Sequence, residues 1–183
     1  KPLKPGVTAI DDVTVKDLIP YIDWTPFFAS WEIKGQFPQI LDDPNRGEAA
    51  RSLYADAQRM LGNMVQEGWL NPRGVVGFWP ANAKGDDITV WTDENRTAER
   101  ATFFGLRQQA AKDNDRPHLS LSDFVSPDGA DWIGGFAVTT GHGVHELSKA
   151  YEAAGDDYNA IMVQALTDRL AEAFAERMHE RVR

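Results

Sequence analysis

Residues 156–183 read DDYNAIMVQALTDRLAEAFAERMHERVR, and this stretch indicates the fold class more clearly than any other part of the chain. It contains no Gly or Pro, and its apolar residues recur at intervals of four, as one face of an amphipathic helix requires. Acids stand at its start and arginines at its end, which the helix dipole favours. We therefore predict a long C-terminal helix over Asp157–Val182. Its apolar face consists of Met162, Leu166, Leu170, Phe174 and Met178.

Similar patterns predict the remaining elements. A second amphipathic helix is expected over residues 48–66, ended by Gly68, and a short one around residues 15–19. A fourth helix is expected over residues 96–112. Strand-like runs cover residues 74–80, 87–92 and 132–138, and the first two are separated by a hairpin-like turn.

Helices and strands do not alternate regularly along the chain, so a doubly wound parallel sheet is not expected. The order favours an α+β domain with a central, mostly antiparallel sheet flanked by helices. The chain opens with KPLKPG, in which two prolines and a glycine stand among cations without periodicity. We expect residues 1–12 to be a linker and residues 13–183 to be the domain.

Composition excludes several classes of function. A formal net charge of -9 argues against a nucleic-acid partner, since phosphate binding needs clustered cations that are not offset by acids. The chain has no Cys, which removes thiol nucleophiles, disulfides and thiolate metal sites and fits a reducing, cytoplasmic compartment. No segment has the apolar length of a membrane span. Six Trp and nine Phe exclude a disordered chain.

Residues 21–28 read YIDWTPFF and place one carboxylate, Asp23, inside a run of aromatic residues. A desolvated carboxylate must find a partner or take up a proton. In one interpretation Asp23 is the N-cap of a short helix that begins just before Pro26. In the other it is a binding-site acid for a cationic, partly apolar ligand, and the rings supply a stacking or cation–π surface. The residues alone leave both interpretations open.

Three acids of the predicted last helix, Asp168, Glu172 and Glu176, fall four residues apart and therefore share one face. They form either a solvated face, balanced by Arg169 and Arg177, or an acidic edge for a cationic ligand or a partner surface. The sequence pattern does not decide between the two.

The histidines give little indication of a metal site. Residues 142–146 read HGVHE, which lacks the helical spacing of His ligands, so we expect a solvated loop there and no metal site. The chain also lacks a Gly-x-Ser-x-Gly elbow and a glycine motif for nucleotide phosphates. A hydrolase that uses Asp23 and His145 as acid and base is a remote alternative.

Several blocks of the sequence resemble the activation domain of cobalamin-dependent methionine synthase, in order and in register from about Tyr21 to Arg183. The resemblance implies a single C-shaped α+β domain with a central antiparallel sheet and a long C-terminal helix. The blocks are DWTPFF at 23–28, LNPRGVVG at 70–77, PAN at 80–82, GDDI at 85–88, LRQQ at 106–109, DFV at 123–125 and the whole of 156–183.

The resemblance also implies a function. In that family the domain binds S-adenosylmethionine and closes over the cobalamin-binding module when the cofactor has been oxidised to cob(II)alamin. An electron from a flavoprotein partner and a methyl group from S-adenosylmethionine then restore methylcobalamin. The whole enzyme is a methyltransferase that acts on 5-methyltetrahydrofolate and homocysteine, with cobalamin and zinc bound by other modules. No catalytic residue is therefore expected in this chain.

Site residues follow from the same resemblance. Asp23 and Glu172 match family acids that bind S-adenosylmethionine, and Asp168 matches a contact to the cobalamin module. The family's further motif, Arg-Pro-Ala-Pro-Gly-Tyr-Pro, is not among these 183 residues. We therefore expect weak ligand binding by this chain, which would be the N-terminal part of the domain. The alternative is an interaction module that docks on a corrinoid protein without binding S-adenosylmethionine.

Overall fold

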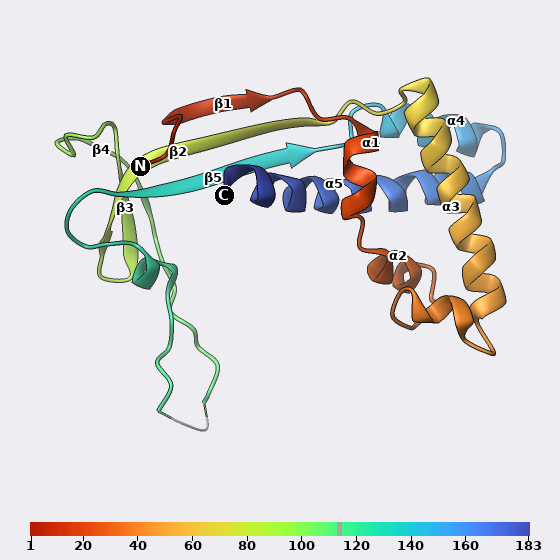
Figure 1. The fold of residues 1–183 in the computed structure, drawn as a ribbon, viewed down its shortest axis with the longest axis horizontal. Coiled ribbons are helices and arrows are strands. Elements are labelled where there is room, and N and C mark those ends of the chain that lie inside the picture. Colours follow the sequence, from red (N-terminus) through yellow and green to blue (C-terminus); the bar gives the residue numbers. More distant parts are fainter. Residues whose placement is uncertain (113–114) are drawn as a thin grey trace. The chain divides into compact units, whose positions relative to one another are not determined.

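The computed structural model describes residues 1–112 and 115–183. Within them, five strands form one sheet in the order β1–β2–β3–β4, and β5 also pairs with β2 (Figure 1). The strands are β1 (Gly6–Ile10), β2 (Arg73–Lys84), β3 (Asp87–Trp91), β4 (Glu99–Phe103) and β5 (Asp131–Thr139). The helices are α1 (Val15–Leu18), α2 (Trp24–Ser30), α3 (Gly47–Glu67), α4 (Val144–Ala153) and α5 (Asp157–Val182), and the 3-10 turns are η1 (Ile19–Tyr21), η2 (Gln39–Asp42) and η3 (Leu121–Phe124).

Strands β2, β3 and β4 form an antiparallel ladder. Lys84 pairs with Asp87 across the tight turn between β2 and β3. In that turn Gly85 has φ +65°, in the left-handed region that glycine adopts without a steric penalty. Strand β3 continues the ladder to β4, with Val90 opposite Ala101. The predicted α+β class with a mostly antiparallel sheet and a long C-terminal helix is confirmed.

The described chain divides into two compact units. The first comprises Lys1–Ala9 and Val75–Phe136, and it contains β3 and β4 with the greater part of β2. The second comprises Ile10–Gly74 and Ala137–Arg183, and it contains α1 to α5.

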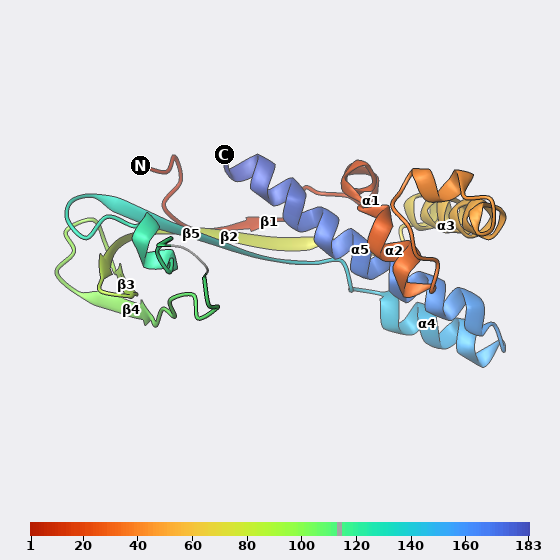
Figure 2. The same cartoon turned by 90° about the horizontal axis from the view of Figure 1, so that it is seen from below.

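Helix α5 is the centre of the second unit. It contacts α1, α2, α3 and α4, and Figure 2 shows α3 and α4 on different sides of it. All members of its predicted apolar face are fully buried, and burial of one such side chain stabilises a fold by about 1.5–3 kcal/mol. At its start the Asp156 carboxylate accepts a hydrogen bond from the Asn159 amide at 3.1 Å. The helix predicted from the four-residue repeat is confirmed with the same bounds.

Helix α3 also matches its prediction closely. It covers Gly47–Glu67, and the amide of Gly68 caps its end by donating to the Met64 carbonyl. Gly68 has φ +65°, the left-handed conformation in which glycine commonly ends a helix. The short helix expected around residues 15–19 is α1.

The prediction of a helix over residues 96–112 is wrong. Residues 99–103 form β4, because pairing with β3 satisfies their backbone groups in the sheet. After β4, Gly105 passes so close to the backbone of Asp86 that a Cβ would lie 1.8 Å from its carbonyl oxygen. Arg107 then donates to Asp86 at 2.6 Å and to Asp123 at 2.8 Å. These partners lie far away in sequence, so local helix propensity could not reveal them.

Two smaller predictions need correction. The expected linker over residues 1–12 contains a strand, β1, whose last residue Ile10 is buried. The expected loop over residues 142–146 is helical from Val144 onward. Gly143 precedes that helix with φ +98°, and a Cβ there would lie 2.4 Å from the carbonyl oxygen of Trp69. The helix therefore starts immediately after a glycine that fits closely against the backbone.

Among the described residues, every helix is too short or too polar to traverse a lipid bilayer.

Candidate functional site

Asp23 is the N-cap of α2. Its Oδ1 accepts a hydrogen bond from the Thr25 amide at 3.0 Å, so the cap interpretation is confirmed. Pro26 fits in the first turn because the amide it lacks would have no partner inside the helix. The side chain of Asp23 is exposed, and in the described parts of the chain its second oxygen, Oδ2, has no protein donor. Capping therefore occupies one carboxylate oxygen and leaves the other available for a ligand.

The aromatic residues that follow Asp23 belong to the core. Trp24, Phe27 and Phe28 are 7%, 1% and 0% exposed. Trp24 packs edge-on against Phe27 at 5.3 Å and against Tyr54 at 4.8 Å between ring centroids. The expectation that this run supplies an open stacking surface is wrong for these three rings. They fix the position of α2, and hence of Asp23.

Three acids on α5 form an exposed face. Asp168, Glu172 and Glu176 are all exposed, as their spacing predicts. The Glu172 side chain is 64% exposed, and its Oε2 accepts a hydrogen bond from Arg169 Nη1 at 2.8 Å. Asp168 has no partner within the described ranges, so its carboxylate is available to a separate surface.

The other arginine that was expected to balance this face has different partners. Arg177 donates to Glu180 at 2.8 Å and to the Tyr21 hydroxyl at 3.1 Å. Its guanidinium lies 5.7 Å from the centre of the Tyr21 ring. Arg177 therefore holds η1 against α5 and does not neutralise Glu176.

The structure brings the elements that carry the predicted site acids into direct contact. Asp23 caps α2, Asp168 and Glu172 lie on α5, and α2 packs against α5 within the second unit (Figure 1). Exposed carboxylates on two contacting helices create a negative potential, which attracts a cationic ligand or a basic partner surface.

A hydrogen-bonded clasp near these elements was not predicted. The Tyr158 hydroxyl on α5 donates to Asp56 Oδ2 on α3 at 2.8 Å, and the ring centroids of Tyr158 and Trp31 are 5.2 Å apart. The hydrogen bond from Tyr158 lowers the pKa of Asp56. Burial, followed by the bond to Asp56, raises the pKa of Tyr158 to about 12. The two residues are 102 positions apart, so no local pattern could pair them.

The two histidines of the segment 142–146 lie outside α2 and α5, the helices that carry these acids. His142 and His145 are exposed, and His145 lies in the first turn of α4. In the portions of the chain that the structure covers, His, Asp and Glu side chains form no cluster of three or more that could hold a metal ion.

Comparison with known families places these residues in context. A family model described as "Vitamin B12 dependent methionine synthase, activation domain" matches residues 14–183. The chain belongs to this family. The resemblance identified in the sequence is therefore confirmed. The activation domain is part of methionine synthase, a methyltransferase.

A solved relative supports the same fold. The crystal structure of the MetH reactivation domain bound to AdoHcy is 49% identical to this chain and matches it with a TM-score of 0.94. The match covers 100% of this activation-domain chain and 56% of that chain, so the present chain spans about half the length of that relative.

Proposed function

We propose that this chain binds S-adenosylmethionine and docks on the cobalamin-binding module of its enzyme, so that oxidised cobalamin is methylated again. The observation that carries the proposal is the Asp23 carboxylate, which caps α2 through one oxygen while the other is free and exposed. The similar reactivation domain is described as bound to AdoHcy, the product that remains when S-adenosylmethionine has given up its methyl group.

The acids of the second unit fit the cationic part of this ligand. S-adenosylmethionine carries a sulfonium and an ammonium group, and a carboxylate that accepts a hydrogen bond from an ammonium forms a strong, charge-assisted bond. We assign Asp23, at the start of α2, to the ammonium group of the ligand. We assign Glu172, on α5, as a second acid that contacts the same ligand. Asp168 is exposed on the Glu172 face of α5, and we assign it to the contact with the cobalamin module.

The chemistry of reactivation requires no proton transfer from this chain. S-adenosylmethionine supplies the methyl group, a flavoprotein supplies one electron, and cob(II)alamin becomes methylcobalamin with release of S-adenosylhomocysteine. The residues of this chain hold and orient the methyl donor and fix the docked arrangement. Cobalamin and zinc belong to other modules in this proposal, and the enzyme works in the cytoplasm with no catalytic residue contributed here.

A second candidate is a docking module that does not bind S-adenosylmethionine. In this candidate Asp23 serves only as the cap of α2 and Asp168 is the docking contact, whereas the family motif Arg-Pro-Ala-Pro-Gly-Tyr-Pro would supply the groups that hold the ligand's carboxylate and adenine.

Calorimetric titration with S-adenosylmethionine separates the two candidates. The chain described here and a chain extended through that motif are titrated under the same conditions. We expect weak or undetectable binding by the shorter chain and saturable binding by the extended one. If neither chain binds, the docking module is the better description. If both bind with equal affinity, the missing motif is not part of the site.

A further inference from the structure

Large apolar side chains are exposed in the first unit, from the end of β4 to η3. Among the described residues from 103 to 124, six of them are between 40% and 86% exposed: Phe103, Phe104, Leu106, Leu119, Leu121 and Phe124. Single exposed apolar residues are ordinary on protein surfaces, whereas a group of them marks a site of interaction. We call these six residues the apolar loop surface.

The apolar loop surface is built from two segments, one after β4 and one around η3, that hydrogen bonds hold side by side. The Gln108 amide donates to the Leu119 carbonyl at 2.9 Å, and the Arg107 guanidinium donates to the His118 carbonyl at 2.6 Å. Arg107 also forms an ion pair with Asp123 in η3 at 2.8 Å. The exposed apolar side chains are thus carried by a backbone that is already fixed, which reduces the entropic cost of docking.

The first unit buries few apolar side chains of its own. In the portions of this unit that the structure describes, they are Val76, Ala81, Ile88 and Val90. By contrast, the largest fully buried side chains of the described residues, which include Phe27, Phe28 and Phe174, all belong to the second unit. Because a sheet is stable when its apolar face is buried against another layer, the small core of the first unit indicates that a covering element packs on it.

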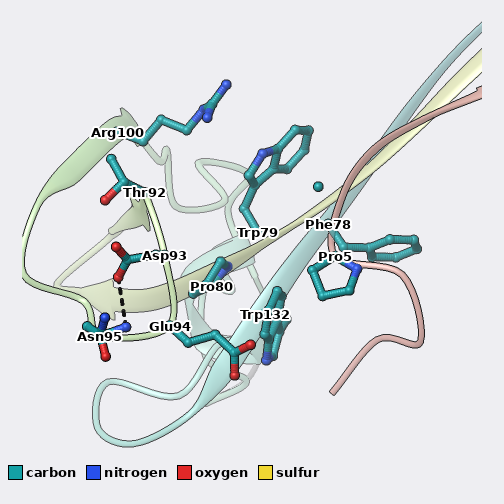
Figure 3. Close-up of a pocket in the computed structure, with 11 residues that line it drawn as sticks. Pro5, Phe78, Trp79, Pro80, Thr92, Asp93, Glu94, Asn95, Arg100 and Trp132 are labelled. Atoms are coloured by element: carbon teal, nitrogen blue, oxygen red, sulfur yellow. Dashed lines mark hydrogen bonds between the residues drawn. The ribbon is translucent and has the colours of Figure 1, made fainter.

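The aromatic rings of the first unit also border open space. Phe78, Trp79 and Trp132 are half-buried and line a pocket of about 420 Å³ (Figure 3). The pocket lies between β2, β5, the loop after β3 and the segment before β1. Rings of this size usually contribute most to a core, so their position beside a pocket agrees with a core that is not complete.

We propose that the apolar loop surface is the docking site for a further segment of the same polypeptide, the part of the activation domain that follows residue 183 and carries Arg-Pro-Ala-Pro-Gly-Tyr-Pro. The similar reactivation domain is considerably longer than the part of it that this chain matches. Its further residues need a surface to pack on, and the first unit has uncovered apolar side chains on a fixed backbone. The segment would bury them with apolar residues of its own and so complete the core of this unit.

Substitution of exposed leucines in two chains tests the proposal. The 183-residue chain and a chain extended through that motif to the end of the domain each carry Leu106→Ser or Leu121→Ser. In the shorter chain both leucines are exposed, so the midpoint of urea unfolding should not change. In the extended chain they should be buried, and the midpoint should fall by about 0.5–1 M urea. An unchanged midpoint in the extended chain would overturn the proposal.

Leu3→Ser is the matched control, because Leu3 is an exposed leucine of the same unit that lies outside the apolar loop surface. It should leave the midpoint unchanged in both chains. If it lowers the midpoint of the extended chain as much as Leu121→Ser does, the added polypeptide does not distinguish the apolar loop surface, and the proposal is wrong. The comparison of these variants within the extended chain holds even if the shorter chain does not fold alone.

Methyl NMR shows directly which leucines are covered. A soluble paramagnetic probe should relax the methyl signals of Leu106 and Leu121 strongly in the 183-residue chain and much less in the extended chain, with Leu3 relaxed strongly in both. Sedimentation of the same samples gives the oligomeric state. If the 183-residue chain forms dimers in which Leu106 and Leu121 are already protected, the occupant is a second copy and the proposal is contradicted. No ligand is added, so the result does not depend on whether the chain binds S-adenosylmethionine.

Discussion

At the scale of single residues, one carboxylate has two separable roles. Asp23 stabilises α2 through a hydrogen bond to the Thr25 amide, and the proposed ligand contact uses its charge. Asn caps helices about as well as Asp, whereas Ala does not cap them. Asp23→Asn should therefore leave the free energy of unfolding nearly unchanged, and Asp23→Ala should lower it by about 1 kcal/mol. Urea denaturation of the two variants measures both values, and equal losses would show that the charge, not the capping bond, stabilises the helix.

The clasp between Tyr158 and Asp56 makes a prediction about acid stability. The pKa of Asp56 is lowered in the folded protein, so its stabilising contribution is present above the unfolded value of about 3.9 and is lost as the pH falls through the folded value. Tyr158→Phe removes the hydrogen bond and should cost about 0.5–1.5 kcal/mol at neutral pH. The variant should therefore lose less further stability than the original chain between pH 5 and pH 3.

Unfolding measured from pH 3 to pH 7 tests this expectation. Tyr151→Phe is a suitable control, because burial is the main cause that raises the pKa of Tyr151 and the described residues offer its hydroxyl no hydrogen-bond partner. Parallel curves of stability against pH for the original chain and Tyr158→Phe would mean that the hydrogen bond between Tyr158 and Asp56 does not contribute to the pH dependence of stability. On the alkaline side, the contribution of Tyr158 should be present below pH 10 and be lost as the pH rises towards 12.

At the scale of elements, the sequence predicts the helices whose apolar pattern and end signals lie within their own residues. Helices α3 and α5 have a continuous apolar face and clear end signals, so their bounds were predicted almost completely. The prediction for strand β4 was a helix, and it is wrong. This segment is a strand because it pairs with β3 and because Arg107, just after it, contacts Asp86 and Asp123. Contacts between residues distant in sequence leave no periodic pattern in the segment itself.

Helix α5 should be the most sensitive element to core substitution. Phe174 is fully buried, and a Cβ at Gly74 would lie 3.1 Å from its ring. Phe174→Ala should destabilise the fold by about 3–5 kcal/mol, since a cavity is left in a packed core. Val182→Ala, near the exposed end of the same helix, should change stability by less than about 0.5 kcal/mol. Chemical denaturation compares the two, and similar losses would contradict the central position of α5.

Asp168 and Glu172 on α5 should have different functions, the first in the docked arrangement and the second in ligand binding. In the full-length enzyme, Asp168→Ala should leave S-adenosylmethionine affinity unchanged but disfavour the reactivation arrangement by about 1 kcal/mol, or fivefold in population. Glu172→Ala should instead weaken ligand binding. The cobalamin absorption spectrum reports the arrangement, and titration reports the affinity. Glu176→Ala, on the same face, is the matched control for both.

This division would be disproved by either of two results. One is an equal loss of ligand affinity in Asp168→Ala and Glu172→Ala. The other is unfolding of the domain by Asp168→Ala, which would make that residue structural.

At the scale of the whole molecule, the site was less predictable than the fold. The role of Asp23 as a cap followed from its position before Pro26, but its assignment to a ligand came from family resemblance. Burial of Trp24, Phe27 and Phe28 was not foreseen, since an aromatic run reads the same in a core and in a binding site. The pocket of the first unit joins residues from β2, β5 and two loops, so only the folded chain reveals it.

The most direct test of the proposed function is the affinity for S-adenosylmethionine of Asp23→Asn in a chain extended through Arg-Pro-Ala-Pro-Gly-Tyr-Pro. Asp156→Asn is the matched control, because Asp156 caps α5 in the same way and is not assigned to the ligand. Titration calorimetry should show Asp23→Asn binding about 1.5–3 kcal/mol more weakly, roughly 10- to 150-fold, with Asp156→Asn unchanged. Binding by Asp23→Asn as tight as that of the original chain would contradict the proposal.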